Sequence, residues 1–215
     1  KNDDDEKVLA KIEALENYTD FSNVPQDKKL MLAKISVVID EYIENYRLDA
    51  ISLRCWNEME TYLRVCPCVL LSELNDRGIV ASCEIDMCSA IAMRAMNLAT
   101  EGATAVLDWN NNYGDDKDKI ILFHCGPAPM SLMREKGKII EHLMFKKTYG
   151  DGSGVGVNKT EIKSGKITVG SVKTEGGKNN SANNKSDQDA GGGKLCFVDE
   201  NLSNCAENAA ADKGF

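Results

Sequence analysis

Short apolar runs alternate with helical patterns over residues 26–124, and this alternation limits the folds open to the chain. The runs DAISLRCW, IVAS, ATAVLDW and KIILFHC are compact, and a polar residue lies at or near the end of each. Such runs are typical of strands buried on both faces of a sheet. Because strands and helices alternate, the sequence predicts a parallel, Rossmann-like α/β sheet with flanking helices.

The patterns between these runs have helical spacing. One apolar face from residue 26 predicts a helix that ends near Arg47, and two short helical pieces follow at 57–65 and 66–78. A further helix is expected over 84–100. Its predicted buried side comprises Ile85, Met87, Cys88, Ile91, Ala92, Ala95 and Leu98.

The pattern changes after about residue 134. Short β-prone runs separated by glycines predict an incomplete, barrel-like all-β domain over 135–215, after an α/β domain over 1–134. Residues 176–193 have almost nothing to bury, so we expect a mobile loop there, with KLCFV as the strand beyond it. A β segment this short closes poorly on itself, and we expect the chain to be cut from a longer protein at both ends.

The charge balance argues against nucleic acid and membrane partners. The 34 acidic and 26 basic residues give a net charge of −8, which repels phosphates and anionic lipid head groups. No run reaches the roughly 18 apolar residues of a membrane span, and the start KNDDDEKV lacks a signal-peptide core. We therefore expect a cytoplasmic protein whose cysteines are reduced and mostly pack as small apolar residues.

Three predicted strands end in side chains that can bind a metal ion. Glu84 follows IVAS, Asp108 ends ATAVLD and His124 ends IILFH. Ligands of open parallel sheets bind beyond the carboxyl ends of the strands, where the loops converge. Two carboxylates and an imidazole suit a divalent ion such as Mn²⁺, Mg²⁺, Co²⁺ or Fe²⁺. The joint placement predicts a metal site with Glu84, Asp108 and His124 as ligands.

Each of these residues also has a structural interpretation. Glu84 and Asp86 would lie in a first helical turn, where acids complement the helix dipole, and Asp86 is better interpreted as support than as a ligand. Asp108 also fits the start of a turn, and His124 also fits a core histidine. At the same predicted edge, Arg54 and Trp56 are candidates for substrate binding, although Trp56 fits a core position equally well.

The motifs RCWNEME, SCEIDMCSAIAM, AVLDWNNN and FHCGPAPMSL resemble the superfamily of L-fucose isomerase and L-arabinose isomerase, with fucose-isomerase-like members closest. The resemblance covers residues 48–133 and is looser beyond them. It implies an aldose–ketose isomerase that acts on a monosaccharide with Mn²⁺ and works as a homo-oligomer, a trimer or a hexamer. The family's N-terminal domain and the later ligand histidine of fucose isomerases would then be missing here.

By this resemblance Glu84 is a metal ligand that also serves as the catalytic acid and base, and Asp108 is the second carboxylate ligand and its catalytic partner. His124 matches a metal-ligand histidine of the arabinose-isomerase branch. Proton transfer would pass through a metal-stabilised cis-enediol, while a hydride shift would use the same residues. A non-catalytic relative that binds a sugar or a metal is the alternative.

Overall fold

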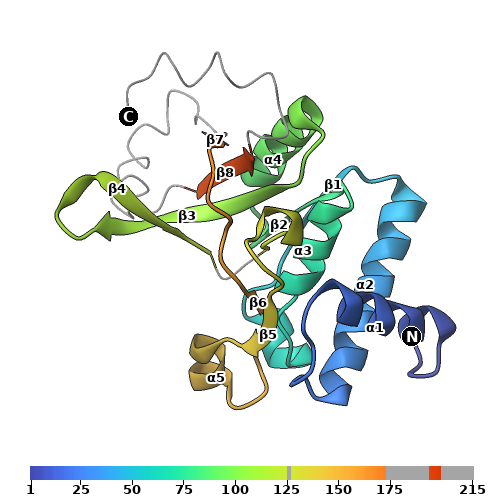
Figure 1. The fold of residues 1–215 in the computed structure, drawn as a ribbon. Helices are drawn as coiled ribbons and strands as arrows, with labels where there is room; N and C mark the ends of the chain where they lie inside the picture. The colour runs from blue at the N-terminus through green and yellow to red at the C-terminus, as the bar shows by residue number, and fades with distance from the viewer. Residues whose placement is uncertain (125–126, 173–193, 200–215) are drawn as a thin grey trace, which may run out of the picture.

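The computed structural model describes residues 1–124, 127–172 and 194–199 (Figure 1). Helices dominate the first hundred residues, and strands dominate the rest of the described chain. In chain order the elements are α1 (Glu6–Tyr18), α2 (Gln26–Tyr46), β1 (Ala50–Leu53), the π-helical turn η1 (Met59–Leu63), α3 (Cys68–Asp76), β2 (Val80–Cys83), α4 (Met87–Thr100), β3 (Thr104–Tyr113), β4 (Asp116–Phe123), the 3-10 turn η2 (Met130–Leu132), β5 (Lys138–Glu141), α5 (Leu143–Tyr149), β6 (Val155–Lys159), β7 (Ile167–Gly170) and β8 (Lys194–Asp199).

Helix α2 is the long helix predicted from residue 26. It ends at Arg47 as expected, because this residue adopts a left-handed φ of 51° and its N–H bonds back to the carbonyls of Ile43 and Glu44. Helix α1 packs against it through Val8, which meets Ala33 in a small apolar cluster. None of the helices in the described chain combines the length and apolar character that crossing a lipid bilayer requires.

Strands β1 and β2 form the parallel pair that the alternation predicts. They pair from Ala50 opposite Val80 to Leu53 opposite Cys83. The side chain of Asn75, near the end of helix α3, is hydrogen-bonded to the backbone of β2. The Asn75 amide donates to the Ala81 carbonyl at 2.9 Å and accepts from the Ala81 N–H at 3.0 Å. This buried double hydrogen bond holds helix and strand in register, so the Cys83 end of β2 has a defined position.

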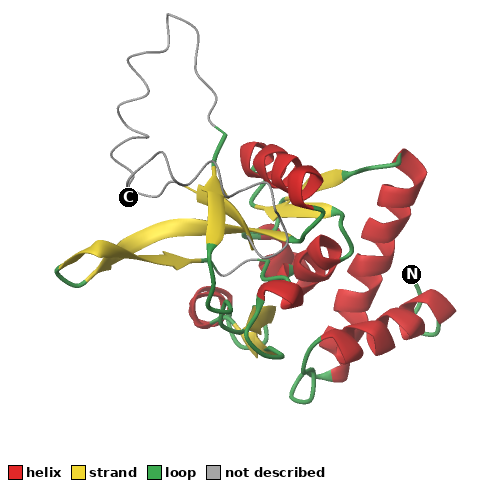
Figure 2. Cartoon of the chain, turned by 45° about the horizontal axis from the view of Figure 1, so that its top comes forward, coloured by secondary structure: helices red, strands yellow, loops and turns green. Residues whose placement is uncertain are grey.

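The other predicted strands of the first domain do not pair with these two strands. β3 pairs antiparallel with both β4 and β8, and β7 completes a sheet of order β4-β3-β8-β7 (Figure 2). The reason is the short link at Gly114, whose φ of 59° makes a tight turn. A turn of this length joins only antiparallel strands, whereas a parallel pair needs a long crossover. A Rossmann-like sheet is therefore not confirmed, and a mixed fold of small sheets takes its place.

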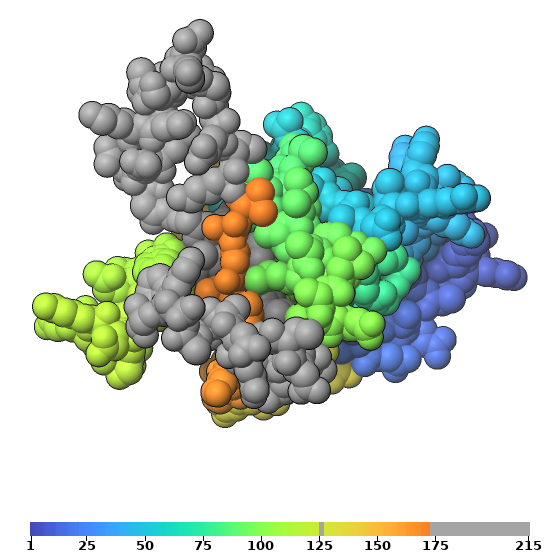
Figure 3. Space-filling model, turned by 90° about the horizontal axis from the view of Figure 1, so that it is seen from above, coloured from blue at the N-terminus to red at the C-terminus, as the bar shows by residue number. Residues whose placement is uncertain are grey.

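The outer part of the β3–β4 hairpin stands away from the rest of the described chain (Figure 3). The first four residues of β3 are buried, while the last five, which pair with β4 alone, are exposed. Asp108 lies at the junction, where the register passes from β8 on one side to β4 on the other. This position keeps Asp108 close to the body of the molecule.

The region predicted to be all-β is partly helical. Residues 143–149 form α5, which His142 caps and Gly150 ends with a φ of 87°. β5 and β6 pair antiparallel, KLCFV is a strand as predicted, and the strands form no closed barrel within the described residues. The expected mobile loop at 176–193 lies outside the described residues. The division into domains at residue 134 stays a prediction.

The predicted buried side of α4 is wrong in most of its members. Met87, Ile91 and Leu98 are 64%, 58% and 65% exposed. The helix instead buries Ser89, Ala90, Ala92, Met93 and Asn97. Small and polar residues fit here because Met93 fills the space against Val80 and Val106, and because the Asn97 amide donates to the Gly102 carbonyl at 2.9 Å. The hydrophobic spacing of α4 therefore describes its exposed face.

Turn η1 carries a buried carboxylate. The Glu60 side chain is fully buried, and neither of its oxygens makes a well-aligned hydrogen bond to another described group. Burial raises the pKa of the Glu60 carboxyl, and nearby backbone N–H groups and the Cys66 thiol offset this only in part. A buried charge without full compensation costs free energy of folding.

Replacing Glu60 with glutamine should therefore stabilise the protein at neutral pH by roughly 1 to 2 kcal/mol. Burial raises the pKa of Glu60 in the folded protein above its unfolded value of about 4.3. The neutral carboxyl is therefore fully tolerated below that value, and the wild type loses stability as the pH rises through the folded pKa and the side chain becomes charged. The advantage of Glu60→Gln should thus vanish near pH 4. Urea unfolding across this pH range measures it. The exposed Glu13→Gln is the control, and an advantage of Glu60→Gln that does not change with pH would contradict the explanation.

Candidate active site

The turn after β2 holds Glu84 in an uncommon backbone conformation. Glu84 and Ile85 have φ values of 60° and 58°, both in the left-handed region. The Ile85 N–H donates to the carbonyl of Leu53, which ties the turn to the end of β1. Each non-glycine residue in this region costs on the order of 1 kcal/mol, and such strain gathers at functional sites. The Glu84 side chain leaves this turn exposed to solvent.

Asp86 is the N-cap of α4. Its carboxylate accepts the N–H of Ser89 at 2.9 Å and the Ser89 hydroxyl at 2.6 Å, while the Ser82 hydroxyl donates to its carbonyl. The supporting role predicted for Asp86 is confirmed. The expectation that Glu84 and Asp86 lie in the first helical turn is wrong, because the helix begins at Met87, Asp86 is its N-cap, and Glu84 and Ile85 form a left-handed turn before it.

Asp108 and His124 come together through the antiparallel hairpin. β3 continues to Tyr113, so Asp108 does not end its strand as predicted, although the buried part of the strand does end at Leu107. Asp108 is paired with Phe123, which places the next residue, His124, beside it. Asp108 Oδ2 lies 3.9 Å from His124 Nε2, and the imidazole is 2% exposed. Two of the three predicted ligands are thus neighbours.

Glu84 and His124 lie close together, and Cys83, which the sequence analysis interpreted as a packing residue, lies with them. Ligand atoms of Cys83, Glu84 and His124 all lie within 4.8 Å of one another. Cys83 Sγ is 3.3 Å from His124 Nε2. The Cys83 thiol also forms a hydrogen bond with the buried thiol of Cys55, and this bond lowers the pKa of Cys55, whereas burial raises it. The signal that could have found Cys83 is its place at the end of β2, directly before Glu84.

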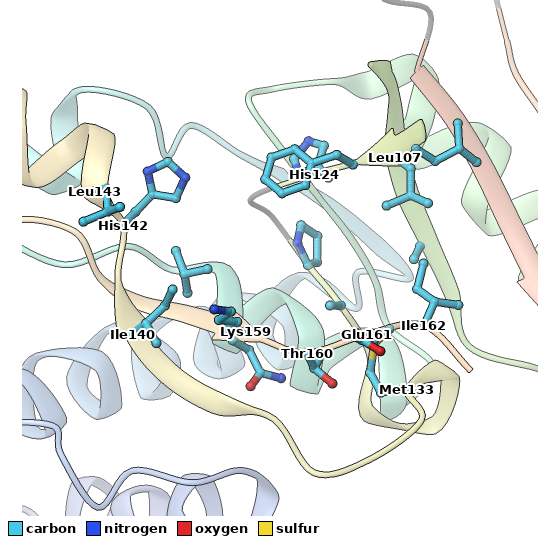
Figure 4. Close-up of a pocket in the computed structure, with 17 residues that line it drawn as sticks. Leu107, His124, Met133, Ile140, His142, Leu143, Lys159, Thr160, Glu161 and Ile162 are labelled. Carbon is cyan, nitrogen blue, oxygen red and sulfur yellow. The ribbon is translucent and has the colours of Figure 1, made fainter. Parts of the chain in front are cut away.

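A cavity of about 510 Å³ opens beside His124 (Figure 4). One side is apolar, with Leu107 and Met133 among its lining residues, and His142 and Lys159 add polar groups from β5–α5 and β6. Burial lowers the pKa of His142, so its imidazole is held neutral more readily than in water. The volume lies within the range of about 300 to 1,000 Å³ that is typical of small-molecule sites.

Of the predicted site residues only His124 lines this cavity, and the two predicted substrate-binding residues, like Glu84 and Asp108, do not. Arg54 follows β1, and its guanidinium forms an ion pair with Glu58 at 2.6 Å. Trp56 is 36% exposed and packs edge-on against Phe145, with ring centroids 5.1 Å apart. The structure thus brings Glu84, Asp108 and His124 into one region and gives Arg54 and Trp56 other contacts.

Comparison with known proteins finds similarity to sulfoquinovose isomerases. One from Priestia aryabhattai is 27% identical over 128 residues, which is 60% of this chain and 29% of that protein. One from Alkalicoccus urumqiensis is 27% identical over 131 residues, which is 61% of this chain and 30% of that protein. One from Clostridium sp. (strain MSTE9) is 28% identical over 116 residues, which is 54% of this chain and 26% of that protein. No family model matches the chain.

The matched region spans about three tenths of the length of these curated relatives. Their names agree with the coarser expectation of a sugar isomerase, and they refer to sulfoquinovose rather than to fucose or arabinose. The chain is therefore similar to part of a sugar isomerase.

Proposed function

We propose that this protein is part of an aldose–ketose isomerase that acts on a monosaccharide, with sulfoquinovose as the first sugar to test. The similarity to several proteins named sulfoquinovose isomerase carries the proposal. The closeness of Glu84 and Asp108 to His124, which lines a cavity of suitable size, supports it independently of any name. Assembly as a trimer or a hexamer stays a prediction.

The residues of this region fit a divalent metal ion. Glu84 and Asp108 offer carboxylate oxygens and His124 offers an imidazole nitrogen, which is a donor set that suits Mn²⁺. When bound, such an ion would polarise the sugar carbonyl and hold the neighbouring hydroxyl in place. The strained turn aims Glu84 outward from the end of β2, where a sugar can reach it.

The reaction needs a proton to leave C2 and to arrive at C1, with further protons exchanged between O1 and O2. In the proposed mechanism the Glu84 carboxylate takes the C2 proton to form a cis-enediol and then delivers a proton to C1. Because Glu84 is exposed, part of that proton exchanges with solvent before delivery. Asp108, beside His124, exchanges the protons of the two oxygens. The buried imidazole of His124 lies close to both carboxylates and lines the cavity in which the sugar would bind.

A panel of aldoses tests this function directly. We expect purified protein with Mn²⁺ to convert at least one of sulfoquinovose, L-fucose, L-arabinose and D-glucose into its ketose, and to incorporate solvent tritium into the product. A product free of tritium would refute the enediol route and favour a hydride shift. Sugar binding without any ketose would instead identify a non-catalytic relative that binds a sugar.

A further inference from the structure

Cys83 stands where the sequence reasoning expected only carboxylates and an imidazole. Its thiol and the side chains of Glu84 and His124 are the one group of at least three potential ligands found within 4.8 Å of one another among the described residues. Asp108 lies outside this group, although it contacts His124 at 3.9 Å. The tightest donor set in this region is therefore one sulfur, one oxygen and one nitrogen.

The spacing of these atoms resembles that of ligands around a tetrahedral ion. With a Zn–S bond of about 2.3 Å and a Zn–N bond of about 2.0 to 2.1 Å, tetrahedral angles place sulfur and nitrogen about 3.6 Å apart. Cys83 Sγ lies 3.3 Å from His124 Nε2 and 4.0 Å from Nδ1. Both donors are rigidly held, since Cys83 ends a paired strand and the imidazole is 2% exposed.

Glu84 supplies the third donor, from the side of the site that faces solvent. Glu84 is exposed, so its side chain can turn toward an ion without displacing packed neighbours. Asp108 is 36% exposed and stands next to the imidazole, where it or a water molecule can supply a fourth ligand. Thiolate favours Zn²⁺ over hard ions such as Mn²⁺ and Mg²⁺, which prefer oxygen.

We propose that Cys83, Glu84 and His124 form a binding site for a thiophilic divalent cation, with Zn²⁺ as the best match. Binding forms a Zn–S bond and releases the Cys83 proton to solvent, so the ion binds more tightly as the pH rises. Because Glu84 and His124 are shared with the proposed Mn²⁺ set, Zn²⁺ at this site excludes the isomerase ion. This last consequence, inhibition by zinc, rests on the proposed function, whereas the binding itself does not.

Cobalt provides the direct test, because a thiolate bound to Co²⁺ gives a charge-transfer band in the near ultraviolet that oxygen and nitrogen ligands do not give. We expect this band with wild-type protein and with Cys88→Ser, a matched change at the other cysteine of the SCEIDMC segment. We expect no band with Cys83→Ser. Titration calorimetry should show Zn²⁺ affinity reduced by more than about 100-fold in Cys83→Ser, with Mn²⁺ affinity unchanged.

A second measurement needs no variant. Zn²⁺ should raise the midpoint of thermal unfolding of the wild-type protein, because an ion held by Cys83, Glu84 and His124 binds the folded chain. Equal Zn²⁺ affinity in wild type and Cys83→Ser, or a wild-type midpoint that Zn²⁺ does not raise, would overturn the inference.

The outcomes also separate this inference from the proposed function. Loss of Zn²⁺ binding in Cys83→Ser, in a protein that never converts an aldose, supports the site and refutes the isomerase. Isomerase activity that Mn²⁺ supports and Zn²⁺ leaves unaffected refutes the site and supports the isomerase.

Discussion

Replacing Glu84 with glutamine is expected to lower the turnover of the proposed isomerase by about 10² to 10⁴-fold and to weaken Mn²⁺ binding. The amide cannot take a proton from C2, and it has no charge to hold the ion. Because the side chain is exposed, the change should leave the thermal stability within about 0.5 kcal/mol of the wild type. Sugar conversion, Mn²⁺ titration and thermal unfolding measure the three quantities separately.

Asp86→Asn is the matched control for this prediction. It removes a carboxylate two residues away, yet asparagine caps a helix about as well as aspartate does, so α4 keeps the hydrogen bond from the Ser89 N–H. We expect its activity and Mn²⁺ affinity to equal those of the wild type. Equal losses in the two variants would mean that Glu84 acts only through the general negative charge of this turn.

Gly156→Ala should be the most destabilising change that we predict, by about 3 to 5 kcal/mol. Gly156 lies in β6 with a φ of 132°, and a Cβ there would overlap the carbonyl oxygen of Cys66 and press on Leu32. β6 cannot shift away, because the Cys66 N–H donates to the Val155 carbonyl at 2.8 Å. The midpoint of urea unfolding measures the loss.

Gly78→Ala is the comparison that separates crowding from backbone conformation. Gly78 follows α3 with a positive φ of 80°, but nothing lies within 4 Å of where its Cβ would be. We expect a cost of about 1 kcal/mol there, from the left-handed conformation alone. If both variants lose the same stability, the close approach of β6 to Cys66 is not what demands glycine at 156.

The sequence predicted the neighbourhood of the candidate site for a reason that proved incomplete. It placed Glu84, Asp108 and His124 together on the premise that three parallel strands end at one edge. The structure brings Asp108 and His124 together through an antiparallel hairpin, while Glu84 alone follows a parallel strand. The roles of all three stay predictions.

Other differences have the same origin in long-range contacts. The apolar spacing of α4 gives two possible faces, and only the position of β1–β2 and β3 selects the one that carries Met93. Cys83 has the local pattern of a packing residue, and its closeness to His124 depends on a residue 41 positions away. Local sequence does not distinguish a buried thiol that packs from one that can bind a metal ion.

The sequence by itself determined the long helix from Gln26, the helix after β2 and the short apolar strands, because periodicity and turn residues act over a few positions. It did not predict α1, and it missed α5 in the region expected to be all-β. The tertiary structure alone decided how β3 pairs, which face of α4 is buried and which donors meet at the end of β2. These features depend on which apolar surfaces, distant in the sequence, pack against each other and away from water. Such packing is decided by the whole folded chain and not by a local stretch of sequence.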